Sequence, residues 1–189
     1  MAMRLPIFFA WIAALLCGCA TTVMRDAPLP VRVADGVLVD STPLVEALLA
    51  RTGTVVQAVS GSWKENTFAA EVVMKGDGQK FTAVFLAPQM RLATITLTHP
   101  HAIRYECAPQ IPRQFEPEYA LADLAFANLD AETLRRAVAP TLRVEDDGTL
   151  RRIFSSETLV ADLARRPDGI LFFRNLVHGY DYTIHPVGP

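Results

Sequence analysis

The sequence has little net charge, and this lack argues against one class of partner. Its 18 lysines and arginines nearly balance 20 aspartates and glutamates. Residues 1–18 contain Arg4 as their single charged residue, so their removal leaves 17 (18 − 1) basic against 20 acidic side chains. A protein that binds nucleic acid needs a basic stripe for the phosphate backbone. We therefore expect no nucleic-acid partner.

The sequence also lacks the motifs of common enzyme classes. In Val59–Trp63, Gly61 stands on the wrong side of both serines for a nucleophile elbow, which also requires a strand followed by a helix. His99 and His101 are separated by one proline, with only Glu106 nearby, and this spacing favours a turn over a metal site. A glycine-rich phosphate loop is absent from the sequence as well. We predict that the protein is not an enzyme and that it holds no metal or other cofactor.

No apolar run reaches the roughly 20 residues that a membrane-spanning helix needs. A shorter run stands at the N-terminus, where Arg4 precedes the apolar stretch Ile7–Leu16 and Gly18 follows it. A positive start, a short apolar core and a small residue are typical of a secretory signal peptide. We predict that residues 1–18 are this signal and are removed. An ordinary cleaved signal, whose next cysteine has no role, is the alternative.

The end of this segment resembles the lipobox of bacterial lipoproteins, in which the cysteine after the cleavage site carries the lipid. Cys19 is then the lipidation site, although Cys17 stands where Ala, Ser or Thr is commoner. The resemblance implies triacylation, and two or more acyl chains hold a protein stably at a membrane. Ala20 replaces the aspartate that resembles an inner-membrane retention signal. We therefore expect an anchor in the outer membrane, with the domain on the periplasmic side.

Cysteine is scarce, with three residues in the whole chain. If Cys17 is removed and Cys19 is blocked by lipid, only Cys107 remains in the oxidising periplasm, where paired cysteines normally form bridges. We therefore expect no internal disulfide.

The mature chain is long enough for one domain. Residues 19–40 carry Pro28 and Pro30 and no sustained periodicity, which predicts a lipidated N-terminus and tether. The folded domain is expected over residues 41–189. It begins with a short amphipathic helix, for which Thr42 is the predicted N-cap and Pro43 the first helical residue.

From Thr54 onwards the apolar residues recur with a period of two, which predicts strands. About five strands joined by short turns are expected before Pro109, and five more after Pro140. Two helices, Glu118–Asn128 and Ala131–Ala139, are predicted between these groups, the second capped by Asp130. So many antiparallel strands can house apolar helices only if the sheet curls around them. The predicted fold is mainly β (α+β), a curled antiparallel sheet or incomplete β-barrel with an inserted helical lid.

The predicted hairpin around Gly76–Gly78 carries its larger apolar side chains on one face. The residues that we expect to line an apolar interior there are Phe68, Val72, Met74, Phe81 and Phe85. The opposite face, with Val73, Val84 and Leu86, is the alternative, because a slip of one residue exchanges the two faces of a strand.

The predicted helix Glu118–Asn128 is apolar on nearly every side. Its apolar residues Tyr119, Leu121, Leu124 and Phe126 are interrupted mainly by Asp123. A helix that is apolar all round is buried on both sides or covers an apolar cavity. We expect these four residues to form a lid over a ligand cavity. For Asp123 an exposed position on the outer side is favoured, because unpaired carboxylates are rarely buried.

Three stretches together resemble a family of bacterial lipoproteins of unknown function: the lipobox, APQIPRQFEPEYALADLAFANLD (108–130) and NLVHGYDYTI (175–184). Members are commonly encoded beside fatty-acid-synthase-like gene sets, including those for aryl polyene pigments of the outer membrane. The expected architecture is similar to that of the LolA/LolB lipoprotein carriers, whose incomplete antiparallel barrel receives acyl chains under a helical lid. In LolB a leucine on a loop inserts into the membrane, and Met90 in the turn 88–91 is the corresponding residue here.

The resemblance implies an outer-membrane lipoprotein that binds an acyl chain, a lipoprotein or a polyene-like lipid in an apolar cavity. Its role would be transport or localisation to the outer membrane, with a periplasmic carrier as delivery partner. A ligand-free lipoprotein that braces an envelope assembly is the alternative, and a lipid-modifying enzyme is a more distant third hypothesis.

Overall fold

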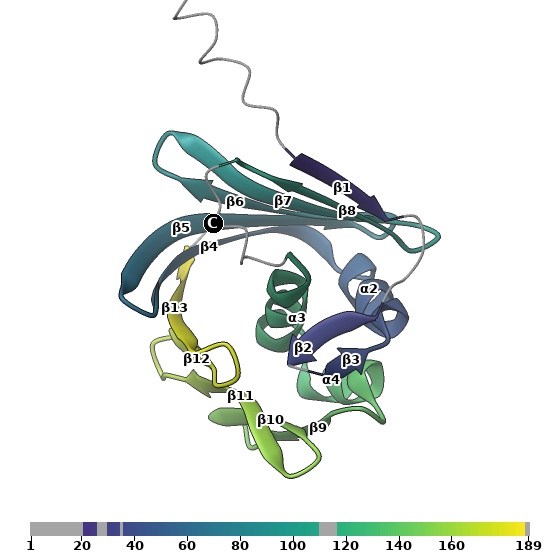
Figure 1. The fold of residues 1–189 in the computed structure, drawn as a ribbon, viewed down its shortest axis with the longest axis vertical. Helices are drawn as coiled ribbons and strands as arrows, with labels where there is room; N and C mark the ends of the chain where they lie inside the picture. Colours follow the sequence, from purple (N-terminus) through teal and green to yellow (C-terminus); the bar gives the residue numbers. More distant parts are fainter. Residues whose placement is uncertain (1–20, 26–29, 35, 110–116, 188–189) are drawn as a thin grey trace, which may run out of the picture.

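Strands dominate the computed structural model, which describes residues 21–25, 30–34, 36–109 and 117–187. Eleven strands form one antiparallel sheet that curls around three described helices (Figure 1). The strand order runs from β1 at one edge to β9 at the other, so the sheet is not closed into a barrel. The predicted curled antiparallel sheet with a helical insertion is confirmed.

The first half of the sheet is a meander of five strands joined by short turns, as expected. They are β4 (Thr52–Trp63), β5 (Asn66–Asp77), β6 (Lys80–Ala87), β7 (Met90–Thr98) and β8 (Ala102–Cys107). The second half is β9 (Arg143–Asp146), β10 (Leu150–Ser155), β11 (Thr158–Arg165), β12 (Leu171–Asn175) and β13 (Tyr180–Val187). β13 pairs with β4 and thereby joins the two halves.

The segment before the domain is not the tether that the sequence predicts. β1 (Thr21–Arg25) pairs with β8 as the edge strand of the sheet, and β2 (Val31–Ala34) pairs with β3 (Val37–Val39). Val31 and Val39 are buried in the core. Strands of three to five residues are too short to show a period, and tertiary pairing stabilises them.

The three helices lie on the concave side of the sheet (Figure 1). They are α2 (Ser41–Leu49), α3 (Pro117–Asn128) and α4 (Ala131–Val138). The Asp130 carboxylate accepts a hydrogen bond from the Thr133 amide at 2.9 Å, which confirms the predicted cap of α4. The predicted cap of α2 is wrong, because Asp40 accepts from the Thr42 amide and Thr42 already lies inside the helix.

The predicted face of the β5–β6 hairpin is confirmed at most positions. Val72, Met74 and Phe81 are buried, and Phe85 is half-buried against the core. Phe68 is the exception, since it is 41% exposed. It shares the inward side of β5 but lies close to the β4–β5 turn, so the prediction of an interior position is wrong for this residue.

Antiparallel pairing places the turns alternately at two rims of the sheet. The rim that we call rim A holds the start of β1 at Thr21 and the turns 64–65, 88–89, 156–157 and 176–179. The opposite rim B holds the turns 78–79, 99–101, 147–149 and 166–170. In Figure 1 the β4–β5 and β6–β7 turns of rim A lie on the left.

Candidate functional site

Helix α3 occupies the concavity of the sheet and is packed on all sides. Leu121 and Phe126 are fully buried, Leu124 and Asp123 are also buried, and Tyr119 in the first turns is half-buried. The sequence predicts a lid over a cavity here. In the described residues Leu121, Leu124 and Phe126 instead pack in the main core.

The C-terminal end of α3 is held by two arginines. Arg151 of β10 donates to the carbonyl oxygens of Phe126 and, at 2.9 Å, Leu129, while Arg51 donates to the carbonyl oxygen of Asn128. These carbonyls have no partner within the helix, and the negative end of its dipole favours cations. This arginine clamp fixes α3 to both halves of the sheet.

The clamp is completed by a buried carboxylate. Asp146 of β9 accepts from Arg151 Nε at 2.7 Å and from both terminal nitrogens of Arg165 at 3.1 and 3.2 Å. Burial acts to raise the pKa of Asp146, but hydrogen bonds from Arg151, the Gly148 amide and Arg165 hold it below its ordinary value. Arg151 is only 2% exposed, so this ion pair is shielded from water.

The N-terminal half of α3 is held by different chemistry. The Tyr180 hydroxyl donates to Asp123 Oδ2 at 2.6 Å and accepts from Asn175 Nδ2 at 3.0 Å. Asn175 Oδ1 also accepts from the amides of Val177 and His178, which shapes the β12–β13 turn. We call these contacts between α3 and the β12–β13 turn the Asp123 seam.

An aromatic contact extends this seam by one helical turn. The rings of Tyr119 and His178 lie 3.8 Å apart between their centroids. Tyr119 and Asp123 are four residues apart, so they lie on the same face of α3. The seam therefore joins one face of the helix to the turn at rim A.

Asp123 is 7% exposed, so the expectation of an exposed position is wrong. Burial raises the pKa of its carboxyl from 3.8 to about 7, although hydrogen bonds from Tyr180, Asn175 and Tyr182 act in the opposite direction. Burial and the nearby Asp123 charge also raise the pKa values of Tyr180 and Tyr182 above their ordinary range. The seam thus holds a carboxyl that exchanges its proton near neutral pH.

Next to the seam, one row of residues crosses the concave face of the sheet near rim A. The pairing register places Phe68 opposite Gly61, Gly61 opposite Tyr182, and Tyr182 opposite Phe173. The rings of Phe173 and Tyr182 stack with centroids 4.7 Å apart. Phe173 is buried, Tyr182 is half-buried and Phe68 is exposed, so the row becomes accessible towards β5. We call these four residues the concave row.

Gly61 lets β13 come close to β4 within this row. A Cβ atom at Gly61 would lie 2.2 Å from the Asp181 carbonyl oxygen and 2.6 Å from Tyr182 Cβ. Any side chain at this position would push the two strands apart, and these strands join the two halves of the sheet.

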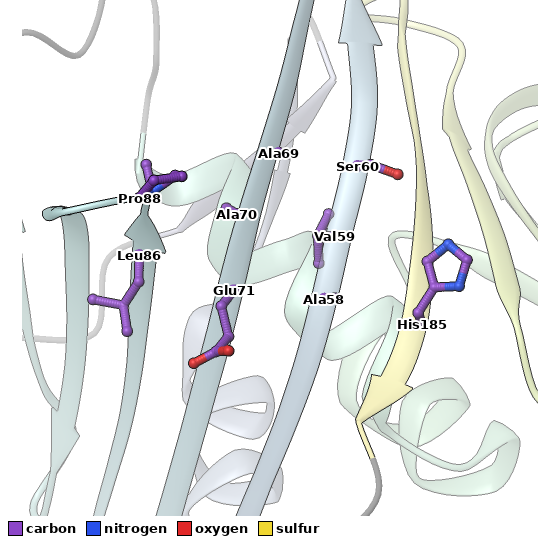
Figure 2. Close-up of a pocket in the computed structure, with 10 residues that line it drawn as sticks. Ala58, Val59, Ser60, Ala69, Ala70, Glu71, Leu86, Pro88 and His185 are labelled. Atoms are coloured by element: carbon purple, nitrogen blue, oxygen red, sulfur yellow. The ribbon is translucent and has the colours of Figure 1, made fainter.

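A second feature lies on the outer side of the sheet. A hollow of about 500 Å³ lies where β4 and β5 meet β6 and β13, and Figure 2 shows the residues that line it. Its lining consists mostly of small or apolar residues, namely Ala58, Val59, Ser60, Ala69, Ala70, Glu71, Leu86, Ala87, Pro88 and His185. The hollow is open to solvent, so it lacks the enclosure of a small-molecule site.

The histidines and serines considered in the sequence are placed as follows. His99 and His101 lie in the β7–β8 turn, where His101 Nε2 is 3.6 Å from Glu46 Oε1. Ser62 donates to Asp181 at 3.2 Å. Over the residues that the structure describes, no three His, Cys, Asp or Glu side chains are grouped so that they could hold a metal ion.

Met90 opens β7 beside the turn 88–89 at rim A and is 37% exposed. Cys19 lies outside the described residues. Within the described parts of the chain, no helix combines the length and the apolar character needed to cross a membrane.

A family described as "Protein of unknown function (DUF3261)" matches residues 54–188, from β4 to the end of β13. The chain belongs to the DUF3261 family. No curated protein matches the chain. The DUF3261 match includes the concave row and the Asp123 seam, whereas β1, β2, β3 and α2 precede it.

Sequence reasoning missed most partners in the seam and the clamp. Asn175, Tyr180 and Tyr182 fall within the stretch 175–184, whose dense polar and aromatic residues were the available signal. Arg151 gave no comparable signal. Arg151 and Arg152 are adjacent in one strand, and the sequence does not indicate which of the two side chains faces inward.

Proposed function

We propose that this DUF3261 protein is an outer-membrane-anchored periplasmic lipoprotein that binds an acyl chain along the concave row. The observation that carries the proposal is the exposed Phe68 on the inward side of a curled sheet, in one row with the aromatic side chains Tyr182 and Phe173. A large apolar side chain exposed beside an aromatic row is a candidate contact for an apolar ligand. The lipobox-like end at Cys19 supports the membrane anchor.

The two ends of α3 suggest how a long chain would be accommodated. The arginine clamp is a buried ion pair, whereas the outer end of the Asp123 seam is formed by the half-buried rings of Tyr119 and His178. We therefore expect α3 to open first at the seam. An acyl chain would begin on the concave row and extend beneath the first turns of α3, which then act as the predicted lid.

Hydrophobic transfer provides enough free energy for this binding. Each buried methylene contributes about 0.8 kcal/mol, so a chain of ten methylenes gains on the order of 8 kcal/mol before ordering costs. Opening part of a packed helix consumes some of this gain. We therefore expect an affinity weaker than micromolar, since a micromolar Kd already corresponds to roughly −8 kcal/mol.

Trp63 provides a direct assay. The two tryptophans of the chain are Trp11, inside the proposed signal peptide, and Trp63, opposite Tyr180 on β13. A brominated fatty acid should quench Trp63 fluorescence in the mature Cys19→Ser protein. Phe68→Ala should weaken this binding about tenfold, or about 1.4 kcal/mol, whereas Leu38→Ala removes an exposed leucine on β3 and should leave it unchanged.

The bracing lipoprotein remains the second candidate, and the burial of Leu121 and Phe126 in the core favours it. Saturable quenching of Trp63 that Phe68→Ala weakens would support acyl binding. An absence of quenching at every fatty-acid concentration would reject acyl binding and favour the brace.

A further inference from the structure

β1 begins almost at the proposed lipid anchor. Thr21 follows Cys19 by two residues, and two extended residues span at most about 7 Å. β1 then pairs with β8 over five residues, from Thr21 opposite Cys107 to Arg25 opposite Ile103. An acyl group on Cys19 is therefore only two residues away from the edge strand of the sheet.

The pairing register gives the place where this connection leaves the sheet. Thr21 lies opposite Cys107, and Cys107 lies opposite Ala93 on β7. Ala93 is three residues from Met90, or about 10 Å at 3.4 Å per residue. Thr21 is two residues from Cys19, so chain length alone keeps Cys19 within about 7 Å of this end of β1.

Rim A also exposes the kinds of side chain that favour a membrane interface. Met90 is 37% and Leu176 is 46% exposed. At the β4–β5 turn the Lys64 ammonium lies 5.3 Å from the centroid of the Trp63 ring. Tryptophan and lysine pairs of this kind place an apolar ring and a charged tip at the boundary between lipid and water.

Rim B has a different character. Asp77 accepts hydrogen bonds from the amides of Gln79 and Lys80, Asp147 from those of Thr149 and Leu150, and Asp168 from that of Ile170. Carboxylates that close turns in this way are exposed anions and favour water. Rim B thus differs from rim A in its turn-closing aspartates, although exposed Val187 lies near rim B and exposed Glu157 lies on rim A.

We propose that β1 is a rigid connection that orients the domain, so that rim A contacts the bilayer that holds the Cys19 acyl chains. The partner is the lipid surface, and Trp63, Met90 and Leu176 contact it. The concave row then opens towards lipid. This inference rests on the proposed lipid anchor, but it adds an orientation that a flexible tether would not give.

The test uses the mature protein lipidated on Cys19, in phosphatidylcholine vesicles with brominated acyl chains, which quench tryptophan only at short range. Trp63 should lose about half of its emission, because interfacial side chains sit 5–10 Å into the headgroup and acyl boundary. A Trp63→Phe/Gln79→Trp variant moves the reporter to rim B. It should lose less than about a tenth of its emission, because that rim faces water.

Two controls separate orientation from other effects. Twelve Gly and Ser residues inserted between Ala20 and Thr21 add a flexible reach of roughly 17–20 Å, and they should reduce the quenching of Trp63 while lipidation persists. The unlipidated Cys19→Ser protein, mixed with the same vesicles, measures quenching by lipid that enters the concave side. Trp63 in the Cys19→Ser protein should be quenched less than Trp63 in the lipidated protein.

Equal quenching of Trp63 and of the tryptophan at position 79 would contradict the proposed orientation without contradicting the lipid anchor. The same holds if the Gly and Ser insertion leaves the quenching of Trp63 unchanged. Quenching of Cys19→Ser equal to that of the lipidated protein would also overturn the orientation. A wild-type protein without any lipid label would reject both the anchor and the orientation.

Discussion

Asp123→Asn should remove a large part of the pH dependence of folding stability. The carboxyl is buried against Tyr180, and its pKa rises from 3.8 to about 7 on folding. The folded state therefore binds the proton more tightly than the unfolded state. Its contribution to the free energy of unfolding is fully present below pH 3.8 and is lost as the pH rises through about 7.

The magnitude follows from the two pKa values. A change from 3.8 to about 7 corresponds to about 4 kcal/mol at 1.36 kcal/mol per pH unit. Most of this loss falls between about pH 4 and pH 7, with a slope of about 1.4 kcal/mol per pH unit in the steep part. Asparagine keeps the shape and an oxygen acceptor for Tyr180 but cannot ionise.

Urea unfolding followed by Trp63 fluorescence at several pH values measures this directly. The wild type should lose stability from about pH 4 to pH 8, and Asp123→Asn should lose roughly 2–4 kcal/mol less over the same range. Asp181→Asn, which lies on the same strand as Tyr180 but on the opposite face of the sheet, serves as the control. If the wild-type and Asp123→Asn stabilities changed in parallel with pH, the buried seam could not be the titrating element.

Three further variants test other parts of the structure. Arg151→Ala removes one of the two arginine donors to Asp146 and the donor to the carbonyl oxygens of Phe126 and Leu129, and it should cost about 3–5 kcal/mol in urea unfolding, whereas Arg152→Ala on the exposed side should cost less than about 0.5 kcal/mol. Leu121→Ala, at a fully buried position, should cost about 2–5 kcal/mol, and exposed Leu176→Ala should have little effect; a small loss for Leu121→Ala would instead indicate a lid over a void. Cys19→Ser should abolish lipid labelling and release the protein from membranes, and persistent labelling would transfer the lipid site to Cys17.

The regular parts of the fold were predictable because each strand carries its own pattern. The period-two apolar residues and the turn signals at Gly76–Gly78 and Asp147–Gly148 gave nearly correct strands, and Asp130 gave the start of α4. β1, β2 and β3 were missed, since such short strands form only when partners far along the chain are present. Phe68 was misplaced because parity gives the side of a strand and not how far the covering helices extend.

The candidate site was less predictable for a related reason. Phe81 and Phe126 could be assigned to the interior from their apolar character, and both are buried. Asp123 was expected in water, because its partner Tyr180 lies 57 residues away and one sequence gives no sign of their contact. The arginine clamp is equally non-local, joining Arg151 to helix carbonyls more than 20 residues earlier. Polar contacts of this kind depend on the three-dimensional register of the sheet.

Native mass spectrometry of the mature Cys19→Ser protein tests acyl binding most directly. The protein should be purified without detergent from cells in which it is exported. The account predicts a fraction of molecules carrying a co-purified acyl compound, which Phe68→Ala reduces and Leu38→Ala preserves. A wild-type spectrum with the bare polypeptide mass alone, unchanged after incubation with excess fatty acid, would contradict it.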